Sequence, residues 1–396
     1  MKPKLRFREF NNDWNEINLK KLLSFKNGIN GDKDSYGHGI KYISVGDILN
    51  NTYITYDKIK GLVDINDKTL KENSVEYGDI VFQRSSETFN DIGQANVYLD
   101  KEKIATFGGF VIRGKKIGNY NPLFFNYLLK SPCNRKKVIV KGAGAQHYNI
   151  SQEELEKINV NFTSEKEQKK IANLFYILDK KIEIQQRKID TLKMYKKGLS
   201  QKLFKSIKFE KDSKKIKISE FLKERKIYSE KGLEYPHVTL SKDGIYDKTS
   251  RYNRDFLVMS KDKEYKITYL NDLCYNPANL KFGVICLNEY GNAIFSPIYI
   301  TLEINTEIVN ERFCKHYFTR VDFINKIRKY EQGTVYERMS VNVEDFLKHV
   351  DIFPSIKKQK EIAQNLDFID IKLKLENKKL NMLDDYKRGL LQQMFI

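Results

Sequence analysis

The residues of this chain that are most capable of catalysis are scattered, and none of them forms a recognisable site. Metal-dependent hydrolysis requires histidines and carboxylates at fixed helical spacing, and nucleotide hydrolysis requires a glycine-rich loop that ends in Lys and Ser or Thr. The sequence contains neither pattern and no CxxC pair. The side chains concerned are His38, His147, His237, His316, His349, Cys133, Cys274, Cys286 and Cys314. We therefore expect no catalytic residue, no metal site and no cofactor held by this chain.

Two further segments are similar to ligand-binding motifs, but each lacks a necessary part. Lys141-Gly-Ala-Gly-Ala145 has the glycines of a phosphate-binding loop, yet it follows a basic helix rather than a strand. Asn276-Pro277-Ala278-Asn279 is similar to the Asn-Pro-Pro-aromatic signature of amino-methyltransferases. It lacks the second proline and the aromatic ring that would stack on a flipped base, so a turn is the better interpretation. The paired carboxylates at 153–154 and 384–385 lie on amphipathic segments, where solvated faces explain them.

The strongest compositional feature is a net charge of +19 at pH 7 in a chain of 396 residues. A surface this basic attracts polyanions and releases their counterions on binding, so the charge favours a nucleic-acid partner. A composition rich in Lys, Ile and Asn, typical of an A+T-rich genome, is the alternative explanation. The excess of Lys and Arg is spread along the chain and is densest in residues 163–204, which suits an extended DNA-lining surface better than one local patch.

The sequence repeats itself at a distance of 191 residues. Residues 164–204 align with residues 355–395 without a gap, and 16 of the 41 positions are identical. Each copy contains Gln-Lys-x-Ile-Ala near its start and Tyr-Lys-(Lys/Arg)-Gly-Leu-x-Gln-x-(Leu/Met)-Phe at its end. A tandem duplication with this period predicts two similar modules in one chain, related by a pseudo-two-fold axis.

Both repeated segments have the periodicity of a coiled coil. The seam positions alternate at spacings of four and three, and they are Ile171, Phe175, Leu178, Ile182, Gln185, Ile189, Leu192, Lys196, Leu199 and Leu203, with the ten residues 191 positions later. Polar residues interrupt the two seams at matched places, Gln185 and Lys196 in one and Glu376 and Lys387 in the other. Polar seam residues typically set the register of a helix pair.

The two segments are expected to pair with each other. At about 1.5 Å per residue, 40 residues form a rod of roughly 60 Å, which needs another helix to cover its seam. A globular segment separates the copies, so the chain can run out, return and close as an antiparallel intramolecular coiled coil. The alternative is that each helix pairs with a copy in another molecule. We attribute Gly198 and Gly389, which occupy matched places in the two helices, to close packing against a neighbouring helix.

The remaining sequence is expected to form two globular modules. Short strands are predicted at 78–82 and 271–275, strand pairs interrupted by Gly or Pro at 103–113 and 293–302, helices at 122–129 and 310–320, and Gly-bearing loops at 141–149 and 332–340. The predicted fold class is α+β, with two mixed α/β globular domains in tandem, each followed by a long helix. The predicted boundaries are 1–162 and 207–354 for the globular domains and 163–206 and 355–396 for the helices.

These features together resemble the specificity subunit of type I restriction–modification systems. The resemblance rests on the two long helices with their shared Tyr-Lys-(Lys/Arg)-Gly-Leu endings, and it covers essentially the whole chain. The Leu5-Arg-Phe7-x-x-Phe10-x-x-x-Trp14 opening and the Asn149-Ile-Ser151-x-x-Glu154-Leu155 segment, which leads into a strand before the first helix, also resemble that family. The globular modules match the family only in size, order and loop placement.

The resemblance implies a non-catalytic subunit that reads double-stranded DNA. Each globular domain would be a target-recognition domain that docks into the major groove and reads one half of a split site. The helices would space these domains and carry two modification subunits, which use S-adenosylmethionine to methylate adenine. Two restriction subunits would add ATP-driven and Mg²⁺-dependent translocation and cleavage. Those cofactors therefore belong to the partners, and none is expected in this chain.

The residues that read bases are predicted from side-chain chemistry. Arg binds guanine, and Asn or Gln binds adenine, through two hydrogen bonds in the major groove. The candidates in the first domain are Arg84, Ser85, Ser86, Gln94, Lys115, Lys116, Lys141, Gln146, His147, Tyr148 and Asn149, and those in the second are Arg251, Arg254, Asn276, Asn279, Lys281, Arg328, Lys329, Tyr336 and Arg338. For any one of them, a solvated loop position or a phosphate contact is the competing interpretation. Because the loops at 82–89 and 275–282 differ, the two half-sites are expected to differ as well.

The sequence also favours a cytoplasmic protein. The charged N-terminal residues lead into no apolar segment, so a signal peptide is not expected, and no apolar run approaches the roughly 20 residues of a membrane span. The cysteines are interpreted as free thiols in a reducing compartment. Two other function classes remain open. One is a DNA-binding regulator or architectural protein that dimerises through the coiled coil, and the other is a methyltransferase or nuclease whose motifs have drifted.

Overall fold

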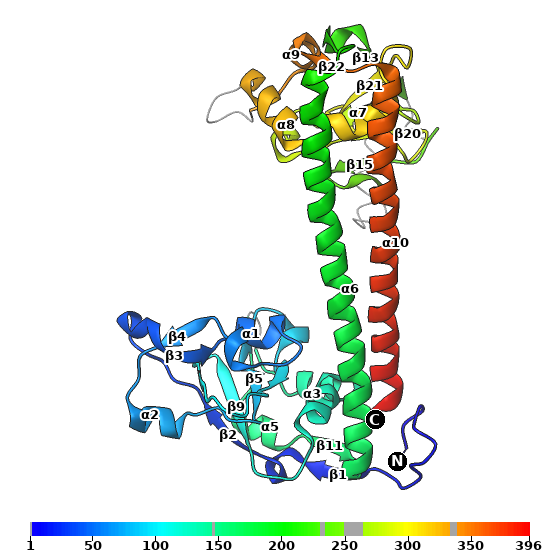
Figure 1. Ribbon diagram of the computed structural model, residues 1–396. Helices are drawn as coiled ribbons and strands as arrows, with labels where there is room; N and C mark the ends of the chain where they lie inside the picture. The colour runs from blue at the N-terminus through cyan, green and yellow to red at the C-terminus, as the bar shows by residue number, and fades with distance from the viewer. Residues whose placement is uncertain (1, 145–146, 230–233, 249–263, 333–338) are drawn as a thin grey trace. The chain divides into compact units, whose positions relative to one another are not determined.

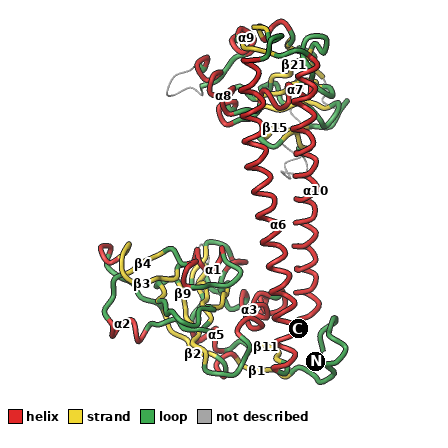
Figure 2. Tube along the Cα trace, viewed as in Figure 1, coloured by secondary structure: helices red, strands yellow, loops and turns green. Residues whose placement is uncertain are grey.

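A computed structural model describes residues 2–144, 147–229, 234–248, 264–332 and 339–396 (Figures 1 and 2). The chain divides into two compact units. The first unit consists of Met1–Arg187 and Asn377–Ile396, and the second unit of Lys188–Glu376. Each unit therefore contains one globular module and parts of both long helices. In the described residues, no helix is both long and apolar enough to cross a membrane.

The module of the first unit mixes short strands and short helices. Its strands are β1 (Asn15–Asn18), β2 (Leu23–Asn27), β3 (Tyr36–Ile43), β4 (Gly61–Val63), β5 (Ile80–Gln83), β6 (Ser85–Ser86), β7 (Ala95–Val97), β8 (Thr106–Phe107), β9 (Val111–Lys116), β10 (Tyr148–Asn149) and β11 (Asn159–Phe162). Its helices are α1 (Val45–Asn50), α2 (Asp67–Glu72), α3 (Pro122–Lys130), α4 (Pro132–Ile139) and α5 (Gln152–Glu156).

The module of the second unit has the same kind of composition. Its described strands are β12 (Lys214–Lys217), β13 (Leu222–Glu224), β14 (Tyr228–Ser229), β15 (Val238–Ser241), β16 (Gly244–Asp247), β17 (Tyr265–Thr268), β18 (Leu273–Tyr275), β19 (Ile285–Leu287), β20 (Ala293–Phe295), β21 (Ile300–Ile304) and β22 (Val350–Phe353). Its helices are α7 (Glu311–Phe318), α8 (Val321–Ile327) and α9 (Val343–Lys348). The long helices are α6 (Glu165–Ser206) and α10 (Ile356–Met394).

The sheets show that the duplication extends into the modules. An antiparallel sheet with the strand order β2-β9-β5-β7 in the first module corresponds to one with the order β13-β21-β18-β19 in the second. The strand that leads into each long helix pairs with the first strand of its module, β11 with β1 and β22 with β12. In each unit an apolar core joins the module to both long helices. The first module packs on the start of α6 and the end of α10, and the second module packs on the end of α6 and the start of α10. The predicted α+β class with two tandem domains is therefore confirmed.

Several predicted elements lie where they were expected. The strands predicted at 78–82 and 271–275 correspond to β5 and β18, and the helices predicted at 122–129 and 310–320 correspond to α3 and α7. The strand pairs predicted at 103–113 and 293–302 differ in their partners: β8 pairs with β3, whereas β9 joins β2 and β5. The chain passes from one sheet to the other at the turn that contains Gly108, where the backbone lies so close to Gly28 that a Cβ on Gly28 would be 2.0 Å from the Gly108 carbonyl oxygen.

The two long helices pair with each other, antiparallel, inside each unit. In the first unit, Phe175 and Leu178 near the start of α6 share a core with Leu390 and Met394 near the end of α10. In the second unit the arrangement is reversed, because residues near the end of α6 pack on residues near the start of α10. Every predicted seam residue is buried or half-buried. The intramolecular pairing is confirmed, and the chain needs no second copy to cover its seam.

A glutamine joins each long helix to its own module in the same way. The side-chain oxygen of Gln168 accepts a hydrogen bond from the backbone N–H of Asn121 at 2.9 Å, and Gln359 does the same for Asn310 at 2.8 Å. Asn121 and Asn310 cap the N-termini of α3 and α7. Both glutamines are buried and are 191 residues apart, so the duplication preserved the joint between helix and module.

The polar residues of the seam also have matched partners. In the second unit Lys196 forms an ion pair with Asp370, and in the first unit Lys387 forms one with Asp179. The 191-residue shift turns one pair into the other. Each aspartate also faces its module: Tyr127 donates a hydrogen bond to Asp179, and His316 lies 4.0 Å from Asp370.

These ion pairs specify the register of the helices. A shift of one helix by a heptad would place Lys196 opposite Ala363 or Asn377, and it would leave Lys387 without its aspartate in the same way. An apolar seam alone tolerates such a shift, because leucine and isoleucine recur every heptad. The matched ion pairs remove that freedom, since a slipped pairing leaves two half-buried lysines without their carboxylates.

The two helical glycines differ from the prediction. A Cβ atom built on Gly198 or on Gly389 would meet no atom of the described chain within 4 Å. The close packing that was expected at these positions is therefore not made within the chain.

We predict measurable coupling between Lys196 and Asp370. In a double-mutant cycle with Lys196→Met and Asp370→Asn, urea unfolding should give a coupling energy of about 1 kcal/mol, because the pair is half-buried. The matched control is Asp190 with Lys193, an exposed pair at 4.0 Å on the same helix, whose coupling should be near zero. Equal coupling in the two cycles would contradict a role in register.

Candidate nucleic-acid interface

Two loops of the first module come together to form a polar surface. One is the segment after β5, in which Arg84 leads into strand β6 (Ser85–Ser86), and the other is the loop that leaves α4, which we call the exit loop. Strand β10 pairs with β6, so that Asn149 lies opposite Ser85 and Tyr148 opposite Ser86. The ring of Tyr148 also packs edge-on against Phe89. Five of the predicted contact residues of this module therefore belong to one surface.

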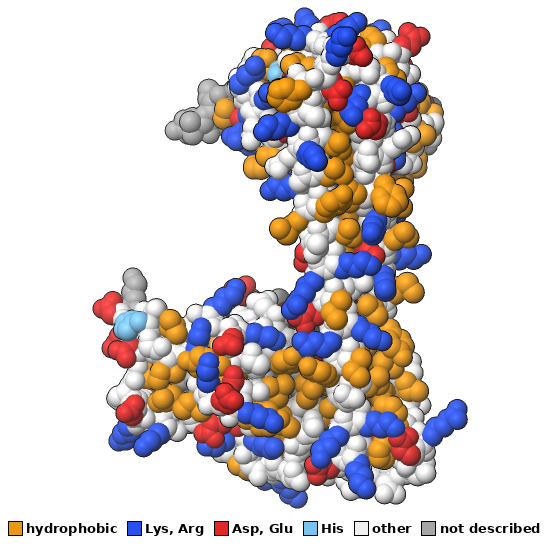
Figure 3. All heavy atoms as spheres, viewed as in Figure 1, with side chains coloured by type: hydrophobic (Ala, Val, Ile, Leu, Met, Phe, Trp, Pro, Cys, Tyr) orange, Lys and Arg blue, Asp and Glu red, His pale blue; other side chains and the backbone are white. Residues whose placement is uncertain are grey.

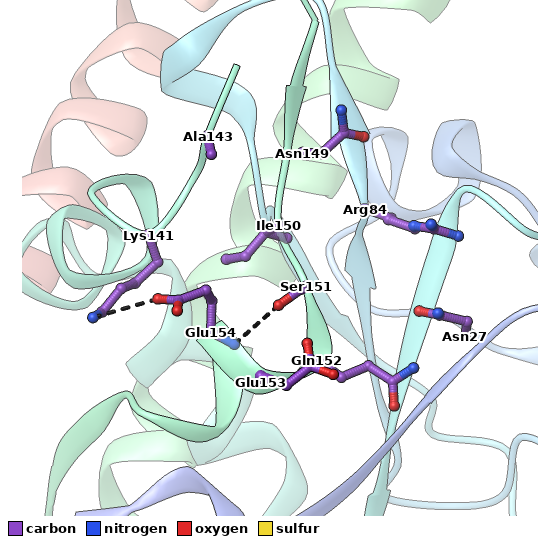
Figure 4. Close-up of a pocket in the computed structure, with 10 residues that line it drawn as sticks. All are labelled: Asn27, Arg84, Lys141, Ala143, Asn149, Ile150, Ser151, Gln152, Glu153 and Glu154. Carbon is purple, nitrogen blue, oxygen red and sulfur yellow. Dashed lines mark hydrogen bonds and ion pairs between the residues drawn. The ribbon is translucent and has the colours of Figure 1, made fainter.

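An open pocket of about 350 Å³ lies where these loops meet (Figure 4). Arg84, Lys141 and Asn149 line it, together with Asn27 from β2 and the start of α5. Lys141 is 3.5 Å from Glu154, so part of its charge is neutralised within the pocket. The pocket is lined by two cations, three side-chain amides and two carboxylates: Arg84, Lys141, Asn27, Asn149, Gln152, Glu153 and Glu154. This set suits hydrogen bonding to bases better than binding a free anion.

Arg84 is held by the backbone around it. Its backbone N–H donates to Phe110 at 2.9 Å, its carbonyl accepts from Ile150 at 3.0 Å, and its guanidinium donates to the carbonyl of Gly109 at 3.2 Å. One hydrogen bond leaves most of the five guanidinium N–H donors for a ligand. The side chain is half-buried, so its orientation is restricted before anything binds.

The remaining candidates of the first module lie in other places. Lys115 and Lys116 are at the far end of β9 from Arg84, where Lys115 is 3.6 Å from Glu76 and Lys116 lies over the ring of Tyr120. Gln94 is half-buried before β7, and His147 is exposed in the exit loop. Gln146 lies outside the described residues.

The second module repeats the connection between its two loops. The backbone N–H of Val341, where the exit loop ends, donates to the carbonyl of Pro277 after β18 at 3.2 Å. This bond corresponds to the one from Ile150 to Arg84 in the first module. Asn276, Asn279 and Lys281 therefore occupy the position that the Arg84 turn occupies in the other module.

Asn276 has a structural role in this turn. Its side-chain oxygen accepts hydrogen bonds from the backbone N–H groups of Ala278 and Asn279 at 3.1 and 3.3 Å, and the residue is buried. Gly283 then ends the turn with a φ of 82°, in the left-handed region that favours glycine. The predicted turn is confirmed, and in it the side chains of Asn279 and Lys281 are more open to solvent than Asn276.

The other candidates of the second module do not join this turn in the described chain. Arg328 and Lys329 are exposed after α8, where Arg328 is 3.6 Å from Glu331 and Lys329 lies over the ring of Tyr330. Arg251, Arg254, Tyr336 and Arg338 lie outside the described residues.

Positive charge is spread over the surface. Figure 3 shows Lys and Arg side chains over both modules and along the long helices on the face in view, as the sequence predicted.

The four cysteines are free thiols. Burial raises the pKa of Cys274 and Cys314 well above the usual value, so these two are inert.

One cluster in the described residues has the composition of a metal site, namely His316, Asp367 and Asp370. Its carboxylates already have cationic partners, because Arg312 donates to Asp367 at 3.0 Å and Lys196 pairs with Asp370. Burial by itself would raise the pKa of Asp367, but the hydrogen bonds from His316 and Arg312 outweigh it and lower that pKa. The cluster therefore works as an ion-pair network that fastens α7 to α10.

Sequence reasoning missed some residues of these sites. Asn27 and Glu153 line the pocket, but they come from segments far from Arg84 in the sequence, and no motif connected them. Asp179 and Asp370 were also missed as partners of the seam lysines. A signal was available, because Asp is among the identical positions of the two repeats.

We predict that Asn276→Ala destabilises the second module. The substitution leaves two backbone N–H groups of the turn without their acceptor, which should cost about 1–2 kcal/mol in urea unfolding. Asn276→Asp keeps the acceptor and should cost less. Asn279→Ala, at the exposed end of the same turn, is the control and should have little effect. A loss for Asn279→Ala as large as that for Asn276→Ala would contradict this assignment.

Comparisons with known proteins all find specificity proteins of type I restriction–modification systems. Residues 11–194 match the model of the type I restriction modification DNA specificity domain. A protein of Methanocaldococcus jannaschii named as the type I restriction enzyme MjaX specificity subunit is 24% identical over 407 residues, which is 97% of this chain and 93% of that protein.

Two solved structures have a similar fold. The S subunit of a type I restriction-modification system from M. genitalium superposes with a TM-score of 0.61 at 17% identity, over 100% of this chain and 99% of that one. A chain from a study of complex assembly and conformational transition of the type I R-M system gives a TM-score of 0.51 at 9% identity, over 96% of each chain.

Proposed function

Because the chain belongs to the family of type I restriction–modification specificity subunits, we propose that it is the sequence-specific DNA-binding subunit of such a complex. It reads a bipartite, asymmetric site in double-stranded DNA and holds the modification and restriction subunits. Residues 1–162 and 207–354 are the two target-recognition domains in this proposal. Residues 163–206 and 355–396 are the spacer helices.

The observation that carries the proposal is that both modules share the same backbone connection, whereas the side chains on the turn after the central strand differ. In both modules a backbone hydrogen bond joins the exit loop to the turn after the central strand, from Ile150 to Arg84 and from Val341 to Pro277. The first turn offers the guanidinium of Arg84, and the second offers the amide of Asn279 and the ammonium of Lys281. Arginine favours guanine and an amide favours adenine, so like frameworks would read unlike half-sites.

We assign the covalent chemistry to partner subunits. Two modification subunits methylate adenine with S-adenosylmethionine, and two restriction subunits use ATP and Mg²⁺ to translocate and cleave DNA. This chain contributes binding and spacing, and its net charge of +19 supports salt-dependent affinity for the phosphate backbone. The complex acts in the cytoplasm, where the DNA is. A regulator that dimerises through its coiled coil is disfavoured, because each unit already fills its own part of the seam.

Mapping methylated adenines in cells with and without this chain tests the proposal directly. We expect a split, non-palindromic motif that is methylated only when the chain and its modification subunits are both present. Methyl transfer by the purified chain alone would refute the assignment, and so would a motif that does not depend on the chain.

We predict that Arg84→Ala relaxes recognition at one position of one half-site. The lost bidentate contact should cost about 1–3 kcal/mol for the preferred base, measured by binding to a library of sites at fixed salt. Arg8→Ala removes the same charge from the exposed N-terminal arm and serves as the control. An equal loss on all sequences would mean that Arg84 contacts phosphate instead.

We also predict that helix length sets the gap between half-sites. A heptad is inserted before Gly198 and another after Phe368, which lies at the same level of the helix pair according to the Lys196–Asp370 contact. The two insertions keep the seam and lengthen the pair by about 10 Å. The permitted gap should grow by about 3 base pairs. A seven-residue insertion in the exposed loop at Lys101–Glu102 is the control and should leave the gap unchanged. An unchanged gap in the lengthened variant would refute this role.

A further inference from the structure

One turn in each module exposes an apolar side chain at the same place. A backbone hydrogen bond of 2.8 Å closes the turn between β8 and β9, at residues 108–111, and one of 3.2 Å closes the turn between β20 and β21, at residues 296–299. The third residue of the first turn is Phe110, and the third residue of the second is Ile298. Their side chains are largely in solvent, with exposed fractions of 67% and 61%.

The sheet register shows that these two positions are equivalent. Phe110 comes two residues before the residue of β9 that pairs with Phe82 of the central strand β5. Ile298 comes two residues before the residue of β21 that pairs with Tyr275 of the central strand β18. Single exposed apolar residues are common, but β-turns favour Gly, Pro, Asn, Asp and Ser. An apolar residue at the same turn position in both modules therefore needs an explanation.

The backbone of both turns is restrained. A Cβ on Gly109 would be 1.8 Å from the side-chain oxygen of Asn30, so the first turn packs tightly against its module. In the second module Pro297 precedes Ile298, and its fixed φ favours a turn at that position. A restrained backbone lowers the entropy that is lost when Phe110 or Ile298 is presented to a ligand.

Phe110 lies beside Arg84. The backbone N–H of Arg84 donates to the Phe110 carbonyl at 2.9 Å, one residue beyond the last pair of the β5–β9 ladder. The guanidinium of Arg84 donates to the carbonyl of Gly109 at 3.2 Å. Opposite residues of an antiparallel pair have Cβ atoms about 4.5–5.5 Å apart, and base pairs follow one another at about 3.4 Å. When Arg84 contacts one base pair, the ring of Phe110 is therefore within reach of the same or the next base pair.

We propose that Phe110 and Ile298 each contact the C5-methyl group of a thymine in the half-site that their module reads. This inference rests on the proposed function. The thymine methyl is an apolar group displayed in the major groove, and apolar side chains bind it. A protein partner would require a contiguous apolar patch of a few hundred Å². Phe110 does not offer one, because Arg84 opposite it and Ser85, the next residue of that strand, are polar.

The test compares thymine with deoxyuridine, which lacks only the C5-methyl group. The methyltransferase assembled from this chain and its modification subunits is titrated with duplexes of the mapped site, in which deoxyuridine replaces every thymine of one half-site. Each half-site contains at least one thymine, opposite its methylated adenine. Wild type should bind each substituted duplex about three- to tenfold more weakly than the unmodified duplex, because a buried methyl contact is lost.

Phe110→Ala should remove this discrimination in one half-site only, namely the half-site whose recognition Arg84→Ala relaxes. Ile298→Ala should remove it in the other half-site only. The matched control is Ile117→Ala, because Ile117 is 60% exposed just beyond the opposite end of β9, and this variant should discriminate in both half-sites. The thermal midpoints of all three variants should equal that of wild type, since each substitution removes a mostly exposed side chain.

Equal binding of the thymine and deoxyuridine duplexes by wild type would overturn the inference and leave the proposed function intact. Discrimination that persists in Phe110→Ala or in Ile298→Ala would overturn it for that module. An equal loss of affinity by Phe110→Ala on all DNA sequences would also overturn it, because the side chain would then contribute no base readout. Wild type that does not prefer the mapped site to unrelated DNA would instead overturn the proposed function.

Discussion

The structure depends on the antiparallel register of α6 and α10, and two ion pairs specify that register. An apolar heptad seam favours association of the helices, but a shift of one helix by seven residues buries nearly the same apolar side chains. Two ion pairs distinguish the observed alignment from the shifted ones, because both form only in this alignment: Lys196 with Asp370 and Lys387 with Asp179. A slipped alignment would leave both half-buried lysines without their carboxylates, so each unit disfavours it. The ion pairs therefore contribute more to specificity than to stability.

Each module is attached to the helix pair by a side-chain hydrogen bond at the start of one long helix. Gln168 and Gln359 attach the start of each long helix to the cap of α3 or α7, and both glutamines are buried. Tyr127 and His316 face the same aspartates that hold the seam lysines, so register and module attachment share their residues. In each unit the aspartate that pairs with a seam lysine therefore also contacts the module, and both the glutamine and the aspartate are identical in the two copies of the repeat.

The loops at the tip of each module are under a different constraint. In both modules a backbone hydrogen bond, from Ile150 or from Val341, joins the exit loop to the turn after the central strand, and side-chain contacts such as Ser85 with Asn149 add to it. Backbone bonds do not depend on side-chain identity, so the side chains at the tip are free to differ between the modules. The same backbone connection therefore presents the guanidinium of Arg84 in one module and the amide of Asn279 in the other. Some exposed residues of the long helices are, by contrast, apolar in both copies, for example Ile184 and Leu375, although the described chain does not cover them.

Much of the fold followed from the sequence, because it is encoded in local or periodic signals. The heptad seam, the 191-residue repeat and the Gly- and Asn-bounded strands predicted the long helices, their pairing and the tandem α+β modules. The strand partners of β8 and β9 did not follow, since the close approach of Gly28 and Gly108 decides them and no periodicity records it. For the candidate interface, the sequence supplied residue types, whereas the tertiary structure decided which of them meet. It brought Arg84, Lys141 and Asn149 together with Asn27, left Lys115 and Lys116 at the other end of a strand, and committed Asn276 to its own turn. The physical reason is that periodic burial can be read along a chain, but contacts between distant loops depend on how the intervening strands are paired.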